Sequence, residues 1–248
     1  MARKAVRRLE IEQVTREVWQ ADGLPTGLVI RVLNVDEETG ARTMIVDVPP
    51  GWEHATPRWH GCDEEFLVLE GELEIGASRY REGHYVFRPA GLVHGPTRSS
   101  GGCRLLYWHE SAFDVRPGSA GAAPSGKPFI DGRDTTVPKE QWERFPVPLP
   151  TPALMIRLRT QEETGCDTTL EWIPPNTMSP AREYHTADEE IYIMDGWAAT
   201  DPKHVYLPGS YLFWEAKTVH GPVHAWDLTC IVKHYGVQET VHVEEERG

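Results

Sequence analysis

The chain has 248 residues and a formal net charge of −13 at pH 7, and a nucleic-acid-binding face is normally basic, so this charge argues against a nucleic-acid partner. No apolar run approaches the roughly 20 residues that span a bilayer. The basic N-terminus, MARKAVRRLE, also lacks the apolar segment of a secretory signal. We therefore expect a cytoplasmic protein without a nucleic-acid or membrane partner.

The residue types predict short strands along the whole chain. Twenty-two glycines and 20 prolines interrupt short runs of Val, Ile, Leu, Trp and Tyr, which is typical of an all-β protein. The helical pattern over residues 9–19 is weak, and a strand is comparably compatible with it. The four cysteines have no CxxC spacing, which argues against a zinc ribbon or a redox pair, and no disulfide is expected in a cytosolic chain.

The chain contains an internal repeat of domain size. LPT at 24–26 recurs at 149–151, a shift of 125 residues, and EETG at 37–40 recurs at 162–165 with the same shift. HGP at 94–96 returns at 220–222 after one extra residue. Repeats in register indicate duplication. We predict an N-terminal domain over residues 1–120, a linker over 121–129 in the small-residue segment RPGSAGAAPSGKP, and a C-terminal domain over 130–248.

The first repeat places polar side chains beside an apolar strand. In DEEFLVLEGELEI, alternation puts Glu64, Phe66 and Val68 on one face of a strand. His60 precedes Glu64 by four residues and shares its parity, and Gly71 ends the strand in a turn. A strand can therefore direct both His60 and Glu64 toward one point.

The second repeat has the same arrangement with His185 and Glu189, and a downstream strand and turn in each repeat add His94 and His220. Two imidazoles and one carboxylate form a ligand set suited to Fe(II), Mn(II), Zn(II) or Ni(II). Three protein ligands leave coordination positions for water, substrate or oxygen, so such a site is typical of a catalytic metal.

These residues resemble the motifs of the RmlC-like cupin superfamily. Gly83, Pro89, Gly91 and His94 have the spacing of the second cupin motif, and the run from His60 to Gly71 has most of the first. The segment HGPTRSSGGCRLLYW resembles the ChrR-like, anti-sigma-factor branch in particular. Because the resemblance covers both halves, it implies a bicupin of two tandem jelly-roll β-barrels, each with a metal pocket.

Both repeats depart from the first motif, which normally opens with a further histidine. Arg58 takes that position in the first repeat, and a guanidinium cannot ligate a cation; we expect Arg58 to form a salt bridge or to bind an anionic substrate group. Glu183 takes it in the second repeat and can be a fourth, anionic ligand. Glu215 and Lys217 replace the proline and glycine of the second motif there, so we expect an altered turn. The intact second motif slightly favours the first repeat as the catalytic one.

Other side chains lie close to these motifs in sequence. His109 and His234, late in each repeat, can orient ligands, although packing or solvent exposure explains them equally well. Trp59, Tyr184 and Trp214 flank ligand positions and can shape substrate access if their parity turns them inward.

Three functions remain open from the sequence. The first is a dioxygenase or other oxidoreductase using Fe(II) on a small, anionic or polarised organic substrate. The second is a non-redox isomerase, cyclase, hydrolase or lyase in which Zn, Mn or Ni acts as a Lewis acid. The third is a non-catalytic cupin that senses a metal or small ligand. Fold analogy also predicts a homodimer.

Overall fold

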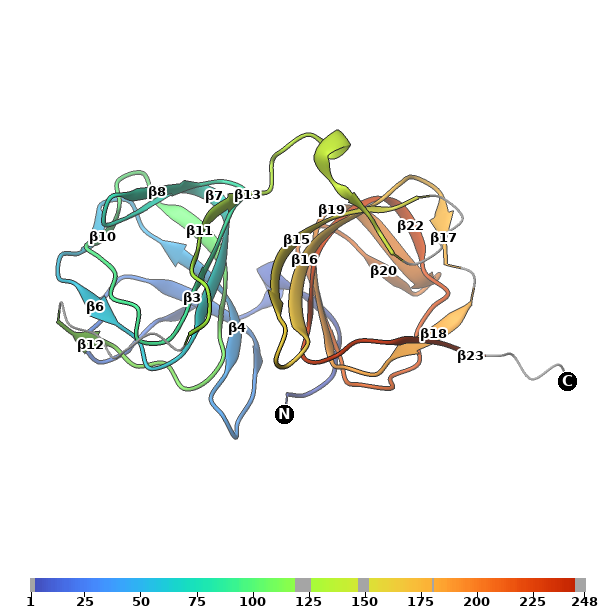
Figure 1. The fold of residues 1–248 in the computed structure, drawn as a ribbon, viewed down its shortest axis with the longest axis horizontal. Helices are drawn as coiled ribbons and strands as arrows, with labels where there is room; N and C mark the ends of the chain where they lie inside the picture. Colours follow the sequence, from blue (N-terminus) through green and yellow to red (C-terminus); the bar gives the residue numbers. More distant parts are fainter. Residues whose placement is uncertain (1–2, 119–125, 147–151, 180, 244–248) are drawn as a thin grey trace, which may run out of the picture. The chain divides into compact units, whose positions relative to one another are not determined.

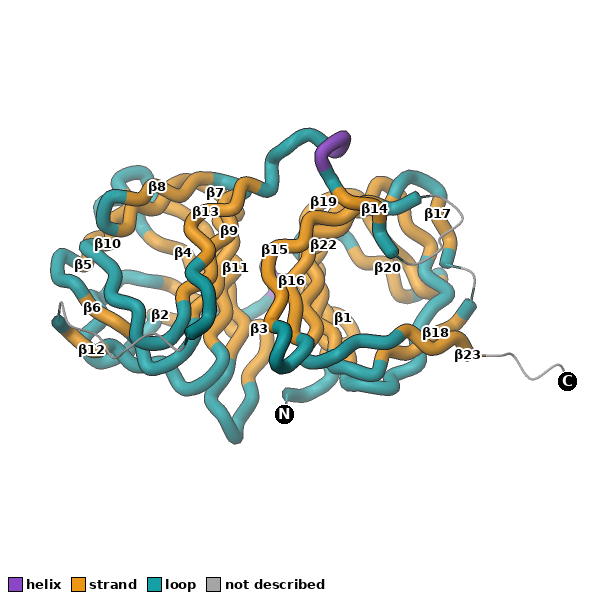
Figure 2. The backbone as a smooth tube through the Cα atoms, in the orientation of Figure 1, coloured by secondary structure: helices purple, strands orange, loops and turns teal. Residues whose placement is uncertain are grey.

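The computed structural model describes residues 3–118, 126–146, 152–179 and 181–243. Helix occurs within these ranges only as the 3-10 turns Ile11–Gln13 and Lys139–Gln141 (Figure 2). The chain divides into two compact units: unit 1 contains Arg3 and residues 14–136, and unit 2 contains residues 4–13 and those after 136. Each unit is a β-barrel of the jelly-roll kind, so the all-β expectation of two tandem barrels is confirmed (Figure 1).

Unit 1 consists of antiparallel ladders. The longer ladder has the strand order β13-β9-β7-β11-β4-β3-β2, and a second ladder joins β5, β10, β7 and β8. The short strands β6 and β12 pair with each other. The strands are β2 Glu17–Val18, β3 Val29–Val35, β4 Arg42–Val48, β5 Trp52–His54, β6 Arg58–Trp59, β7 Glu64–Ile75, β8 Ser78–Arg81, β9 His84–Arg88, β10 Thr97–Ser99, β11 Cys103–His109, β12 Arg116–Pro117 and β13 Ile130–Asp134.

The long strand β7 belongs to both ladders of unit 1. Its first half pairs with β9 and β11, and its second half pairs with β8 and β10. Gly71 lies between the two halves with φ 76°, and a Cβ added there would approach the carbonyl oxygen of Gly102 to 2.3 Å. Only glycine fits this bend, because other residues disfavour positive φ and the neighbouring backbone leaves no space. The predicted turn at Gly71 is thus a bend inside a continuous strand.

Gly71→Ala tests this close contact. We expect it to lower the free energy of unfolding by about 2 kcal/mol or more, because strain at positive φ adds to overpacking against backbone. Gly51→Ala is the matched control, since Gly51 has φ 77° but nothing within 4 Å of an added Cβ. Urea denaturation should give the control a loss of about 1 kcal/mol. Equal losses in the two variants would show that the contact with Gly102 is unimportant.

Unit 2 repeats this plan. Its main ladder has the order β1-β21-β19-β22-β16-β15-β14, with β17 paired to β22 and β20 paired to β19. The short strands β18 and β23 pair with each other. The strands are β1 Val6–Glu10, β14 Glu143–Arg144, β15 Leu154–Gln161, β16 Cys166–Ile173, β17 Thr177–Met178, β18 Arg182–His185, β19 Glu189–Asp201, β20 His204–Tyr206, β21 Ser210–Trp214, β22 His224–His234 and β23 Thr240–Val243.

The observed unit boundaries differ from the expected domains over residues 1–120 and 130–248. Strand β1 pairs with β21 of unit 2, with Leu9 opposite Tyr211, whereas β13 pairs with β9 of unit 1. Strand β1, which belongs to the first repeat by sequence, therefore covers an edge in the second, and β13, which lies in the expected C-terminal domain, covers an edge in the first. Without these strands, backbone groups at both edges would be unpaired. Residues 9–19 contain the end of β1, a 3-10 turn and β2, so neither a continuous helix nor a continuous strand forms there. Residues 121–125 of the expected linker lie outside the described residues.

The remaining expectations about the chain concern cysteines and membrane spans. All four cysteines are free, as expected. Within the described ranges, no helix has the length and apolar character to cross a membrane.

Candidate metal centres

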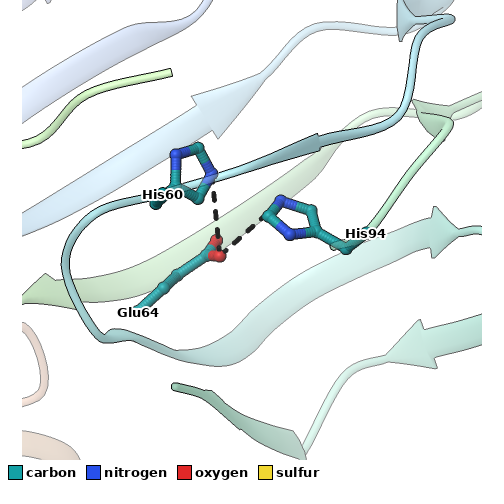
Figure 3. A group of neighbouring side chains, drawn as sticks. All are labelled: His60, Glu64 and His94. Carbon is teal, nitrogen blue, oxygen red and sulfur yellow. Dashed lines mark ion pairs between the residues drawn. The ribbon is translucent and has the colours of Figure 1, made fainter. Parts of the chain in front are cut away.

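Three predicted ligands meet in unit 1 (Figure 3). His60 follows β6, Glu64 begins β7, and His94 lies between β9 and β10. Backbone hydrogen bonds between Arg58 and His94, 2.8 and 2.9 Å long, hold these segments together. Glu64 Oε2 lies 4.0 Å from His60 Nε2 and 3.9 Å from His94 Nε2, and all three side chains point toward one another. The group has the composition and spacing to hold one ion.

The hydrogen bonds of the two imidazoles prepare them as ligands. His60 Nδ1 lies 2.5 Å from the carbonyl oxygen of Asp114, and His94 Nδ1 lies 3.1 Å from that of Leu92. Because a carbonyl only accepts hydrogen bonds, each Nδ1 carries the proton and each Nε2 presents a lone pair toward Glu64. Burial lowers the pKa of His60, and it lowers that of His94 to about 3. Both rings are therefore neutral at physiological pH, as metal binding requires.

Two atoms at the centre of this group are buried without a hydrogen-bond partner among the described residues. They are Glu64 Oε2 and His94 Nε2. Burial raises the pKa of Glu64, but attraction to His94, which is protonated only in the acid range where Glu64 titrates, and to Arg88 outweighs burial and lowers it to about 2, so Glu64 is ionised. A buried carboxylate and an imidazole lone pair that face each other are unfavourable unless a cation lies between them. The donor set of unit 1 thus fits a divalent ion.

Two buried arginines near Glu64 weaken the binding of a cation in unit 1. Arg58 and Arg88 are 6% and 3% exposed, and Arg88 Nη1 lies 3.8 Å from Glu64 Oε2. Arg58 interacts electrostatically with Glu64, and burial lowers its pKa. Two guanidinium charges beside one carboxylate make the local charge positive, which weakens a divalent cation at the same place. The expected nearness of Arg58 to the site is observed; its role in binding substrate stays a prediction.

Unit 2 brings three of its four predicted ligands into one group and places the fourth, Glu189, beside His185. Glu183, His185 and His220 form a group whose ligand atoms lie within 4.8 Å of one another. Strand β18 supplies Glu183 and His185, and paired backbone hydrogen bonds of 2.8 and 2.9 Å join Glu183 to His220. Glu189, at the start of β19, places Oε1 3.5 Å from His185 Nε2. Glu183 therefore adds a second carboxylate, as its position in the motif suggests.

The turn before His220 keeps its geometry despite the departures from the motif. Lys217 has φ 67°, close to the left-handed conformation of a glycine, and its N–H donates to the carbonyl oxygen of His185 at 2.8 Å. Gly91 in unit 1 has φ 84° and donates to His60 at 2.9 Å. The expectation of an altered turn is wrong, because the backbone hydrogen bond holds Lys217 in a conformation that its side chain disfavours.

The imidazoles of unit 2 also have fixed partners. His220 Nδ1 lies 3.0 Å from the carbonyl oxygen of Thr218, so its Nε2 is a free lone pair, as in unit 1. His185 Nδ1 contacts the Gln238 amide at 2.8 Å and the Thr240 hydroxyl at 3.3 Å. These side chains orient the His185 ring. They come from the C-terminal segment, where the repeat contains no motif to reveal them.

His234 contacts a candidate ligand directly. Its Nδ1 donates to Asp167 at 2.8 Å and its Nε2 donates to Glu189 at 3.3 Å. Burial alone would lower the pKa of His234, but the hydrogen bonds to Asp167 and Glu189 outweigh burial and raise it to about 10. His234 is therefore a buried cation that holds Glu189, and Glu189 Oε2 has no hydrogen-bond partner in the described part of the chain. The expectation that His234 orients a ligand agrees with these contacts.

The equivalent histidine of unit 1, His109, is neutral instead of cationic. His109 faces Glu64 across β11 and β7 as His234 faces Glu189 across β22 and β19. The neighbour of His109 on the next strand is Arg42, whereas the neighbour of His234 at the equivalent position is Asp167. Burial and, to a smaller extent, the charge of Arg42 lower the pKa of His109 to about 4. His109 is thus a neutral imidazole, whereas hydrogen bonds to two carboxylates make His234 an imidazolium.

The ligands of unit 2 line a cavity of about 300 Å³. Apolar strand residues form most of its wall, and the Trp214 ring stacks on His220 with centroids 4.0 Å apart. In unit 1 the corresponding interior is a hydrophobic cluster that includes the aromatic side chains of Phe66, Tyr107 and Trp52. At these positions unit 2 has smaller side chains: Ile191 is equivalent to Phe66, Val232 to Tyr107, and Thr177 to Trp52.

Sequence reasoning missed two interior residues. Arg88 directly precedes Pro89 of the second motif, and this adjacency was the available signal. Glu171 lies in the segment TTLEWI on β16, lines the cavity of unit 2, and is 7% exposed. Its sequence signal was a lone carboxylate in an inward-facing strand position.

Comparisons with known proteins agree with this architecture. Residues 10–113 match the family model described as the ChrR cupin-like domain. A solved structure from Nostoc punctiforme PCC 73102, described as "a putative dioxygenase", shares 16% identity with a TM-score of 0.83, covering 99% of this chain and 92% of that chain. A mutant of Bacillus subtilis oxalate decarboxylase shares 12% identity with a TM-score of 0.57, covering 97% and 80%. No curated protein matches. The findings support a cupin superfamily protein with a candidate metal site.

Proposed function

We propose that this bicupin is a metal-dependent enzyme that acts on a small organic compound, and that unit 2 carries out the reaction. The observation that carries the proposal is the position of Glu183, His185 and His220 in the wall of an apolar cavity of about 300 Å³. Cavities of this size and character bind small organic molecules. A ligand cluster that opens into such a cavity can hold an ion and a substrate side by side.

The residues of unit 2 have separate tasks in this proposal. His185 and His220 would hold the ion together with Glu183 and Glu189, and a redox-active ion bound there supplies the activation of dioxygen and substrate. Trp214 fixes the His220 ring by stacking, and His234 fixes Glu189 through its hydrogen bond. The apolar wall excludes water from the reacting groups.

Unit 1 suits a different role, although its intact second motif favoured it at the level of sequence. Larger side chains point into its interior at three positions where unit 2 has smaller ones, and Arg58 and Arg88 add positive charge beside Glu64. We infer that unit 1 stabilises the protein and binds any ion more weakly than unit 2.

Fe(II) is the ion we favour, with dioxygenase chemistry, and the likeness to the Nostoc structure over nearly the whole chain supports it. A non-redox reaction with Mn(II) is the second candidate. It is favoured by the two carboxylates, Glu183 and Glu189, beside His185, because hard oxygen ligands suit Mn(II).

Metal analysis and oxygen uptake test the proposal together. Protein purified without added ions should contain a transition metal, and after loading with Fe(II) it should consume oxygen with small diketones or phenolic ketones. Turnover with Mn(II) or Zn(II) but without oxygen uptake would identify the non-redox alternative. The double variant His60→Ala/His185→Ala should lose metal and activity. Unchanged metal content and activity in that variant would overturn both enzymatic functions.

A further inference from the structure

A polar pair lies in the wall of the unit 2 cavity. Thr169 and Glu171 are both on β16 and both line the cavity. The Thr169 hydroxyl donates to Glu171 Oε1 at 2.9 Å. The cross-strand neighbours of Glu171 are Met155 and Cys230, which offer no charge. A carboxyl group therefore faces the cavity from between apolar neighbours.

The equivalent pair in unit 1 is apolar. Met44 and Val46 occupy the same ladder positions on β4 and belong to the packed core. The barrel therefore forms without a carboxyl group at this position. Burial of a carboxyl is unfavourable, and it raises the pKa of Glu171 to about 7. The barrel therefore does not require Glu171 for packing, whereas a ligand that donates a hydrogen bond to it would account for it.

The charge of the cavity restricts that ligand. Its lining residues include the acids Asp167, Glu171, Glu183 and Glu189, the cations Arg157 and His234, and the candidate ligands His185 and His220. Asp167 and Glu189 are held by His234, and Arg157 Nη1 lies 3.7 Å from Asp167. Unit 1, by contrast, has Arg58 and Arg88 beside its ligands. The described side chains of the cavity thus provide no excess of positive charge to bind an anionic substrate.

The spacing along β16 also suits a small molecule. His234 hydrogen-bonds both Asp167 and Glu189, so these two residues lie at the same height in the barrel wall. Glu171 follows Asp167 by four residues along the strand. At about 3.3 Å per residue, these levels are about 13 Å apart. A one-ring compound with a polar group at each end bridges such a distance when one group reaches the ion and the other forms a hydrogen bond.

We propose that the unit 2 cavity binds a small, uncharged or cationic compound with an apolar body, whose hydroxyl or amine group donates a hydrogen bond to Glu171. This substrate class rests on the proposed function, because the opposite end of the compound reaches the proposed ion. Glu171 then selects for a hydrogen-bond donor and against a carboxylate.

Benzyl alcohol, benzylamine, toluene and benzoate are matched probes for the full-length protein. Saturation-transfer NMR and calorimetry should show that the wild type binds benzyl alcohol and benzylamine at least about tenfold more tightly than benzoate. Glu171→Val, which restores the side chain of unit 1, should lose about tenfold in affinity for the alcohol and amine but not for toluene, as expected for a lost hydrogen bond to a carboxylate. Glu171→Gln keeps the side-chain size and should lose affinity for benzylamine most.

Thr169→Val is the control, since it removes the partner hydroxyl and keeps the carboxyl; it should retain the order of the four probes. Thermal unfolding verifies that each variant folds. An unchanged order in Glu171→Val, or no binding of any probe by the wild type, would overturn the proposal. Metal analysis of the same samples separates the two proposals, because a protein without metal that still prefers benzyl alcohol contradicts only the enzymatic function.

Discussion

His220→Ala should abolish turnover and remove the ion of unit 2, with metal affinity reduced by more than about 100-fold. Changes to side chains that merely orient a ligand already cost about 10- to 100-fold, and His220 would supply an electron pair to the ion itself. In the wild type, the hydrogen bond between His220 Nδ1 and the carbonyl oxygen of Thr218 leaves Nε2 as the ligand atom, and alanine offers no atom in its place. Metal content per chain and oxygen uptake measure the two effects.

His94→Ala is the matched variant of unit 1, since His94 has the same position, tautomer and type of backbone partner. It should leave turnover within about twofold of the wild type and remove only ion bound to unit 1. Loss of turnover in His94→Ala with retention in His220→Ala would assign catalysis to unit 1 and contradict our proposal.

His234→Phe should lower the free energy of unfolding of unit 2 by about 3–5 kcal/mol, the usual cost of breaking a buried ion pair by removing one partner. The variant leaves the half-buried carboxylate of Asp167 and the buried carboxylate of Glu189 without their shared cation. Chemical denaturation of metal-free protein measures the loss. His109→Phe is the control and should cost less, because His109 is neutral and makes its Nδ1 hydrogen bond to a backbone carbonyl, that of Ser111, at 2.6 Å.

The same ion pair predicts a pH dependence of metal-free stability. The pKa of His234 is raised from 6.5 to about 10 by folding, so its contribution is complete below pH 6.5 and is lost as the pH rises toward 10. The pKa of Glu189 is lowered from 4.5 to about 2, so its contribution is complete above pH 4.5 and is lost as the pH falls toward 2. His234→Phe should abolish the alkaline loss. An equal alkaline loss in wild type and variant would show that His234 is not the titrating group.

Much of this architecture was predictable from local patterns. The repeat of His60 and Glu64 at His185 and Glu189 implied two related barrels, because strand alternation requires the same inward face in both. Motif spacing also placed His94 and His220 with them, since the turn before each histidine is closed by local backbone hydrogen bonds.

Other features depend on contacts between distant segments. The charge of His234 depends on Asp167 across a ladder, and its partner position in unit 1 has Arg42 instead. No local pattern contains that difference, because it arises from side chains that meet only when the strands pair. The placement of β1 in unit 2 has the same origin.

By itself, the sequence determined the duplication, the all-β fold and the identity of the candidate ligands, because these follow from repeat spacing and two-residue alternation along single strands. Only the tertiary structure decided that unit 2 has the cavity beside its ligands and that Glu171 faces it. The physical reason is that cavity volume and side-chain charge depend on the sum of side chains contributed by many strands, whereas a strand pattern depends on one.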